Sequence, residues 1–192
     1  MPFQAPRGTF DILPDEEEIW NKVQQACFET ARLFGYRYIE TPVFEESGLF
    51  QRTVGENTDI VEKEMYSFDD KGGENISLRP ENTAGVCRAF IENGLHNTTL
   101  PSRLFYYGPM FRYERPQSGR YRQFHQFGIE CIGEASPDVD YEVIKIAWDV
   151  LKILDFSNVV LNVNSLGDSQ DRHLYSEELK KYYSKYLNDL PR

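Results

Sequence analysis

Arginines gather in one short stretch of a chain that is acidic overall. Residues 103–122 contain a single acid, Glu114, and five arginines: Arg103, Arg112, Arg115, Arg120 and Arg122. The whole chain carries a formal net charge of −10. Guanidinium groups match phosphate oxygens through paired hydrogen bonds, so this local cluster indicates a bounded anion site, with phosphate as the favoured ligand.

The same stretch alternates like two strands around a turn at 116–119, and alternation sorts side chains onto two faces. The face after the turn carries a guanidinium, a ring, an amide, a missing side chain and a carboxylate: Arg122, Phe124, Gln126, Gly128 and Glu130. Arg112 and Glu114 join that face if even-numbered residues pair with even-numbered ones. A five-residue loop at 116–120 would impose this register.

Glycine inside a strand often marks the close approach of a ligand or another backbone, and Gly128 occupies such a position. The opposite face carries a mixed set that predicts packing: Gln123, His125, Phe127 and Ile129. A simpler hypothesis stays open, because charged residues on a solvated strand face can serve solubility alone.

Composition limits the classes of protein that fit. A chain of 192 residues with 40% hydrophobic content is typical of a globular protein. Acidic charge disfavours broad nucleic-acid binding, although not a local contact with a nucleic-acid end. No apolar run reaches the length of a membrane span and no signal peptide begins the chain, so we expect a cytoplasmic protein without a membrane partner.

Cysteines and histidines show no spacing that indicates a disulfide framework or a zinc site. They are scattered along the chain at Cys27, Cys87, Cys131, His96, His125 and His173. We therefore predict no protein-bound metal.

Periodicity and turn signals predict the elements that must position the charged stretch. Helices are expected at 15–34, with Asp15 as its cap, and at 46–54, 81–93, 139–154 and 170–187. Strands are expected at 36–41, 65–68, 75–78 and 159–163 and in a central hairpin at 103–133. Hairpin-connected strands mixed with helices indicate an α+β fold, an antiparallel sheet flanked by helices.

Common nucleotide and hydrolase motifs are missing from the sequence. The chain has no GxxxxGK[ST], no GxGxxG and no nucleophile elbow. A bound nucleotide would therefore meet arginines on a sheet.

Several stretches carry a resemblance to a known family. Phe111-Arg112-Tyr113-Glu114, followed by a loop and a strand, resembles motif 2 of the class II aminoacyl-tRNA synthetases. Four stretches resemble the histidyl-tRNA synthetase family in order and spacing: PRGTFDILP from Pro6, GENTDIVEKEMYSF from Gly55, LRPENTAG from Leu78 and GRYRQFHQFGIE from Gly119. Pro42 matches the proline of motif 1, and the resemblance covers essentially the whole chain.

The resemblance implies ATP-dependent activation of histidine, with Mg²⁺ on the ATP phosphates, and transfer to tRNA(His). Arg112 is then the catalytic residue, which holds the α-phosphate of ATP and the carboxylate of histidine. The other implied ATP contacts are Glu114 to the adenine amino group, Phe124 stacked on adenine and Arg120 at the outer phosphates.

The resemblance also implies which residues contact histidine. The α-amino group is expected among Glu81, Asn82, Thr83 and Gln126, and Glu130 is expected to bind the imidazole. Taken singly, these residues have simpler interpretations: Glu81 after Pro80 also suits an ordinary helix start, and Phe124 suits a core position.

Family members are longer, and their RGLDYY-type segment, motif 3 and anticodon-binding domain are absent from this chain. We therefore expect residues 1–192 to be the N-terminal part of a class II catalytic domain, with motifs 1 and 2, inactive alone. Motif 1 implies a homodimer. The alternative is a related non-catalytic protein, the regulatory subunit of ATP phosphoribosyltransferase. A generic nucleic-acid-binding module is disfavoured by the charge.

Overall fold

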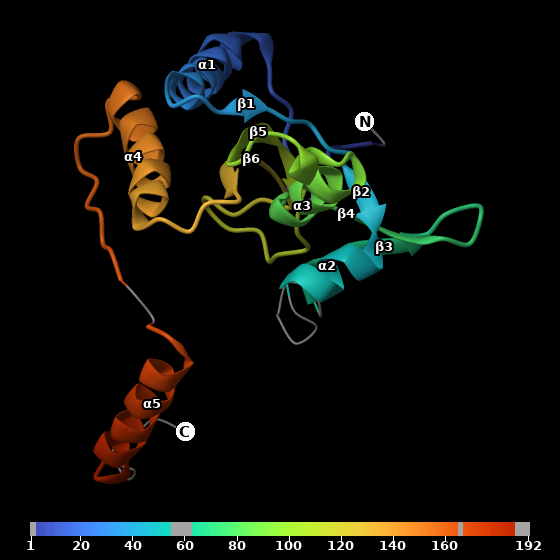
Figure 1. Cartoon of the computed structure of the whole chain (residues 1–192). Helices are drawn as coiled ribbons and strands as arrows, with labels where there is room; N and C mark the ends of the chain where they lie inside the picture. The colour runs from blue at the N-terminus through green and yellow to red at the C-terminus, as the bar shows by residue number, and fades with distance from the viewer. Residues whose placement is uncertain (1–2, 55–62, 165–166, 187–192) are drawn as a thin grey trace. The chain divides into compact units, whose positions relative to one another are not determined.

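The computed structural model describes residues 3–54, 63–164 and 167–186 of the chain. It divides into two compact units, Met1–Phe156 and Ser157–Arg192. Helices of the first unit are α1 (Glu17–Leu33), α2 (Ser47–Val54), α3 (Thr83–Glu92) and α4 (Pro137–Ile153) (Figure 1). Its strands are β1 (Arg37–Tyr38), β2 (Phe44–Glu46), β3 (Tyr66–Asp69), β4 (Asn75–Leu78), β5 (Ser102–Phe111) and β6 (Gln123–Ile132).

Strands of the first unit form two three-stranded sheets. One has the order β1-β5-β6, with β5 antiparallel to β6 and β1 parallel to β5. The other has the order β2-β4-β3 and is antiparallel throughout. The α+β class is therefore confirmed, but the parallel pair was not predicted. Alternation identifies a strand without identifying its partner, and β1 lies more than sixty residues before β5 in the sequence.

The long hairpin has the predicted register. Met110 lies opposite Phe124 and Gly108 opposite Gln126, so even-numbered residues of β5 face even-numbered residues of β6. The predicted five-residue loop is wrong, because the connection runs over residues 112–122. It contains its own tight turn, in which Gln117 and Arg120 bridge around Ser118 and Gly119, and Gly119 has a φ of +78°.

Each face of the hairpin packs against different helices. On the odd-numbered face, Phe105 packs with Ala31 of α1 and Ile146 of α4. On the even-numbered face, Tyr106 and Met110 pack with Val86 of α3. The predicted packing role of the odd-numbered face is confirmed, with Phe127, Ile129 and Cys131 beside the first cluster.

Gly128 is required by a neighbouring side chain. It lies directly opposite Tyr106 in the ladder, and a Cβ atom at Gly128 would fall inside the Tyr106 phenol ring. A group does approach Gly128 closely, but it is a cross-strand side chain and not the ligand or backbone that was predicted. Tyr106 is 4% exposed as a result and forms the floor of the even-numbered face.

Helix starts show one wrong prediction. Asp15 does not cap α1; the helix follows a 3-10 turn at Pro14–Glu16, where the Leu13 amide donates to the Glu16 carboxylate at 3.2 Å. A glutamate two residues after proline can reach back to an upstream amide. The predicted end is correct, since Gly35 takes a φ of +80° just past α1.

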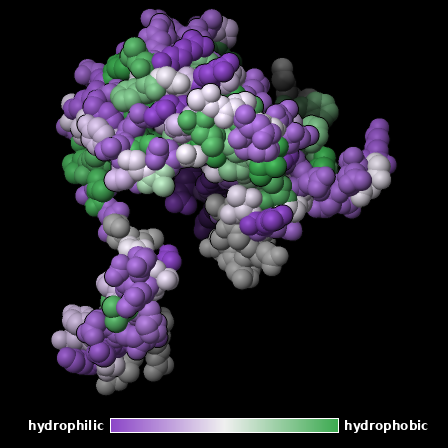
Figure 2. Space-filling view, viewed as in Figure 1, coloured by the Kyte–Doolittle hydropathy of each residue, from purple (hydrophilic) through white to green (hydrophobic). Residues whose placement is uncertain are grey.

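The second unit differs from its prediction. Residues 159–163 form no strand, and Val160 is 79% exposed, because the run pairs with no neighbour in the described residues. Helix α5 (Ser169–Ser184) is capped by Asp168 and buries no side chain. The face of α5 that Figure 2 shows is mostly hydrophilic. Leu187, the predicted helix end, and residues 55–62 of the GENTDIVEKEMYSF stretch lie outside the described residues.

No helix in the described ranges is both long and apolar enough to cross a membrane.

We predict that Gly128→Ala lowers the free energy of unfolding by about 1–3 kcal/mol, because the added methyl overpacks the Tyr106 ring. Chemical denaturation of the protein measures this difference. Gly48→Ala is the matched control, since a Cβ at Gly48 meets no atom within 4 Å. Equal stability of the two variants would contradict the packing argument.

Candidate functional site

The hairpin register places the predicted charged groups on one side of the sheet. Phe124, Gln126 and Glu130 share the even-numbered face of β6. Arg112 continues the same ladder beyond β5, because its amide donates to the carbonyl of Arg122 at 3.0 Å. The first turn of α3 meets this face, so residues far apart in the sequence surround it.

Arg112 is held by the backbone of another segment. Its Nε donates to the Pro80 carbonyl at 2.8 Å, and its guanidinium carbon lies 5.1 Å from the centroid of the Phe124 ring. Its Nη1 lies 3.9 Å from a carboxylate oxygen of Glu114. One edge of the guanidinium is therefore fixed, which aims the other nitrogens along the hairpin face.

The loop beyond Arg112 carries an ion pair that is more exposed to solvent. Arg120 pairs with Glu114 at 3.4 Å, but the Arg120 side chain is 64% exposed. Exposed ion pairs of this kind contribute only ~0–1 kcal/mol, so Arg120 can exchange partners easily. Arg122 joins the two ends of the loop. Its Nε donates to the Glu114 carbonyl at 3.2 Å, and its guanidinium lies 3.9 Å from the Tyr113 ring centroid.

At the start of α3, two side chains serve the site and the helix together. The Thr83 hydroxyl donates to Glu130 Oε1 at 2.7 Å. The Glu81 carboxylate accepts the amides of Thr83 and Ala84 at 2.6 and 3.0 Å. The simpler interpretation of Glu81 as a helix-start residue is therefore confirmed, and its carboxylate also lies next to the Thr83–Glu130 pair.

Asn82 makes its side-chain hydrogen bond with Thr41, a residue outside the predicted set. Its side chain is 1% exposed, and its Oδ1 accepts the Thr41 hydroxyl at 2.6 Å. Its Nδ2 has no hydrogen-bond partner among the described residues. This hydrogen bond ties the N-cap residue of α3 to the segment after β1.

Burial changes the acidity of two groups on this face. Desolvation raises the pKa of Glu130, the charge of Glu81 adds to that effect, and the Thr83 hydrogen bond opposes it. Burial, with the charge of Glu130, also raises the pKa of Tyr106 to about 12. The Tyr106 hydroxyl donates to Gln126 Oε1 at 3.4 Å and so orients that amide. Tyr106 was not among the predicted site residues, because its only signal in the sequence is a tyrosine that pairs with a glycine once the exact register is known.

The even-numbered face is not a solvated strand surface. The side chains of Arg112 and Glu114 are 23% and 17% exposed, and Met110 beside them is fully buried. The solubility hypothesis is therefore wrong for this face. A fixed cation, an aromatic ring and partly desolvated carboxylates suit a small ligand that carries a positive and a negative group.

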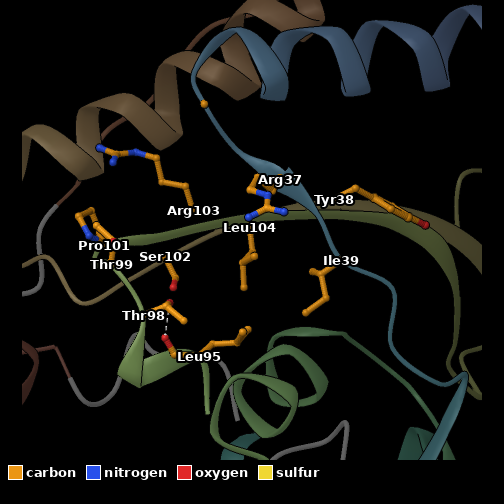
Figure 3. Close-up of a pocket in the computed structure, with 11 residues that line it drawn as sticks. Arg37, Tyr38, Ile39, Leu95, Thr98, Thr99, Pro101, Ser102, Arg103 and Leu104 are labelled. Carbon is orange, nitrogen blue, oxygen red and sulfur yellow. Dashed lines mark hydrogen bonds between the residues drawn. The ribbon is translucent and has the colours of Figure 1, made fainter. Parts of the chain in front are cut away.

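A separate cavity of about 540 Å³ lies elsewhere in the unit, between β1, the start of β5 and the 3-10 turn at Leu95–Asn97. Figure 3 shows Ile39, Leu95 and Leu104 around its centre, whereas Arg103 points away from it. Arg103 donates instead to Glu142 of α4 at 3.1 Å. None of the predicted site residues lines this cavity.

Comparison with known proteins shows a family to which the chain is similar. A sequence model described as "Histidyl-tRNA synthetase" matches residues 8–167. A histidine–tRNA ligase of Dehalococcoides mccartyi is 50% identical over 188 residues, which make up 98% of this chain and 45% of that protein. One from Thermosynechococcus vestitus is 52% identical over 190 residues, 99% of this chain and 44% of that protein.

Solved structures agree with the sequence relatives. Apo histidyl-tRNA synthetase of S. aureus is 37% identical, with a TM-score of 0.77 over 98% of this chain and 44% of that chain. A Bacillus halodurans protein, named as ATP phosphoribosyltransferase regulatory subunit/histidyl-tRNA synthetase, is 26% identical with a TM-score of 0.71, covering 98% of this chain and 52% of that one. The chain thus spans less than half the length of the curated relatives.

We predict that Glu130→Gln stabilises the protein at neutral pH. A raised pKa means that the folded state holds the Glu130 proton more tightly than the unfolded state, so ionised Glu130 destabilises the fold. The glutamine keeps an acceptor for Thr83 without the charge. The gain should be complete above the folded pKa and vanish as pH falls to the ordinary glutamate range, as denaturation between pH 8 and 4 can measure. Glu46→Gln, at an exposed glutamate of β2, is the control. A loss of stability at neutral pH would contradict the prediction.

Proposed function

Because the chain belongs to the histidyl-tRNA synthetase family, we propose that the complete protein carrying these residues attaches histidine to tRNA(His) through a histidyl-adenylate. The curated relatives are histidine–tRNA ligases, and this chain covers 45% of the length of the Dehalococcoides relative. Charging of tRNA serves protein synthesis, so we place the activity in the cytoplasm.

The observation that carries this proposal is the even-with-even register of β5 and β6. It gathers Arg112, Phe124, Gln126 and Glu130 on one face, next to the first turn of α3. An amino acid and a triphosphate need neighbouring sites for cations, a ring and carboxylates, and this face supplies all three. The roles given to single residues below extend this observation.

Arg112 acts at the reacting atoms in this proposal. A carboxylate oxygen of histidine attacks the α-phosphorus of ATP, the bond to pyrophosphate breaks, and pyrophosphate leaves with the electron pair. Negative charge builds up on the α-phosphate oxygens during this step. A guanidinium that the Pro80 carbonyl already holds at 2.8 Å stabilises that charge without reorganising.

The remaining proposed ATP contacts come from the Phe124 ring and from the loop between β5 and β6. Phe124 stacks on adenine, and Glu114 accepts from the adenine amino group. Arg120 leaves its exposed pair with Glu114 to reach the outer phosphates, a change that costs little because that pair is solvated.

Histidine binds between α3 and β6 in this proposal. Glu130 accepts an imidazole N–H, and a donor there offsets the desolvation that raises the Glu130 pKa. Glu81, Thr83 and Gln126 surround the α-amino group. A buried acceptor discriminates strongly, because an analogue without the donor leaves it unpaired. Asn82 contributes by holding the start of α3.

Mg²⁺ enters this scheme with ATP. The described residues contain no group of three His, Cys, Asp or Glu side chains that could hold a metal. Mg²⁺ usually keeps several waters and binds through one or two carboxylates together with substrate phosphates. In this proposal the ion would therefore travel with ATP and offset the phosphate charge.

The same fold supports a second candidate, the regulatory subunit of ATP phosphoribosyltransferase. The observation in its favour is the B. halodurans structure, whose name includes that role. The groups proposed for adenine and the outer phosphates, Glu114, Phe124 and Arg120, favour the ligase, since a histidine sensor does not need them.

A homodimer is proposed through α1 and β1. Leu33 at the end of α1 is 82% exposed and Tyr38 of β1 is 40% exposed. Exposed apolar side chains favour a protein contact, and Tyr38 also lines the cavity (Figure 3). We expect sedimentation at micromolar concentration to give a dimer, and Leu33→Glu to weaken it. A monomer under these conditions would contradict the proposal.

We predict that Arg112→Ala lowers histidine-dependent ATP–pyrophosphate exchange by at least ~10²-fold in the complete protein, as removal of one fixed donor to a developing anion does. Arg172→Ala, at an exposed arginine of α5, is the control. A wild-type protein without exchange but with effects on ATP phosphoribosyltransferase would favour the regulatory subunit. An active wild type with an unchanged Arg112→Ala rate would remove Arg112 from the reaction.

A further inference from the structure

Arg79 is a buried cation that joins three segments beneath the proposed site. It is 4% exposed. Its Nε donates to the Pro109 carbonyl at 2.9 Å, and its Nη1 donates to the carbonyl and hydroxyl of Thr41 at 2.9 and 3.2 Å. The guanidinium therefore connects the segment after β1 to strand β5.

The partners of this guanidinium are neutral. No carboxylate forms an ion pair with Arg79 in the part of the chain that the structure describes, and burial lowers its pKa against the opposing charge of Glu40. A buried charge without an ionic partner is unfavourable for stability alone. A hydrophobic side chain of similar size would suit a purely structural position better, which points to a geometric role.

Gly108 shows how closely the guanidinium is seated. A Cβ atom at Gly108 would lie 2.6 Å from Nη2 of Arg79. Gly108 lies opposite Gln126 in the ladder, so Arg79 crosses the even-numbered face beside a proposed histidine contact. The backbone of Gly108 is outside the left-handed region, so space and not conformation demands glycine here.

The backbone of the same segment holds the catalytic arginine. The Arg79 amide donates to the Val43 carbonyl at 2.9 Å, and the Arg79 carbonyl accepts the Phe111 amide at 3.0 Å. The next carbonyl, that of Pro80, accepts Nε of Arg112 at 2.8 Å. Arg79 is thus anchored by side chain and backbone immediately before the carbonyl that orients Arg112.

We propose that Arg79 is a positioning residue for the adenylation step, which holds the Pro80 carbonyl in place and thereby aims the Arg112 guanidinium. This inference rests on the proposed function. It assigns Arg79 no contact with histidine or ATP. Misplacement of a reacting group by about 1 Å can lower a rate ~10²-fold, so such a role is measurable.

The test uses two changes in the complete protein. Arg79→Lys keeps the charge, but a lysine lacks the planar fork that spans Pro109 and Thr41. Gly108→Ala keeps Arg79 and pushes its Nη2 out of place. Each should lower kcat for histidine-dependent ATP–pyrophosphate exchange about 10- to 100-fold, with a smaller change in KM for ATP. Gly48→Ala, which meets no atom within 4 Å, should leave kcat unchanged.

Double variants separate positioning from general support. If Arg79 acts through Arg112, adding either change to Arg112→Ala should lower the remaining rate less than about threefold. The proposal would be overturned if either change lowered the rate of the Arg112→Ala variant by the same factor as it lowers the wild-type rate. It would also be overturned if the single variants had an unchanged kcat. Circular dichroism during the assay confirms folding, and Arg79→Lys decides the outcome if Gly108→Ala does not fold.

The wild type distinguishes the two levels of inference. A wild-type protein without histidine-dependent exchange overturns the proposed function and the Arg79 inference together. An active wild type in which Arg112→Ala is impaired but the Arg79 and Gly108 variants are not overturns the Arg79 inference alone.

Discussion

The pairing of β5 with β6 is the constraint on which the rest of the structure depends. A shift by one residue would exchange the two faces of β6, and Phe124, Gln126 and Glu130 would then face α1 and α4. The observed register places the Tyr106 ring against Gly128, where a Cβ atom would overlap Cζ of the ring. This close fit of a large side chain against a glycine favours the register and, with it, the composition of the site.

The two cores that follow from this register have different tasks. The odd-numbered face is closed by α1 and α4 around Phe105 and stabilises the sheet. The even-numbered face is closed only in part by α3 around Met110, which leaves polar groups at its rim half-buried. Partial burial raises the pKa of Glu130 and restrains Arg112, and both effects favour binding of a small charged ligand.

Hydrogen bonds from guanidinium groups to neutral carbonyls recur around the site. Arg79 is held by Pro109 and Thr41, and Arg112 by Pro80. A carbonyl partner fixes the direction of a guanidinium without neutralising it, and the Glu114 carboxylate near Arg112 lies farther away, at 3.9 Å. The exposed Arg120–Glu114 pair represents the opposite case, a contact that is easily exchanged.

The sequence by itself determined the helices, the two hairpins, the α+β class and the set of polar groups on one strand face, because alternation and glycine or proline signals act over a few residues. The tertiary structure decided what local patterns cannot carry. It paired β1 with β5, left 159–163 without a strand partner in the described residues, bonded Asn82 to Thr41 and placed Arg79 across Gly108. Each of these depends on contacts between residues far apart in the chain, and such contacts exist only after the chain has packed.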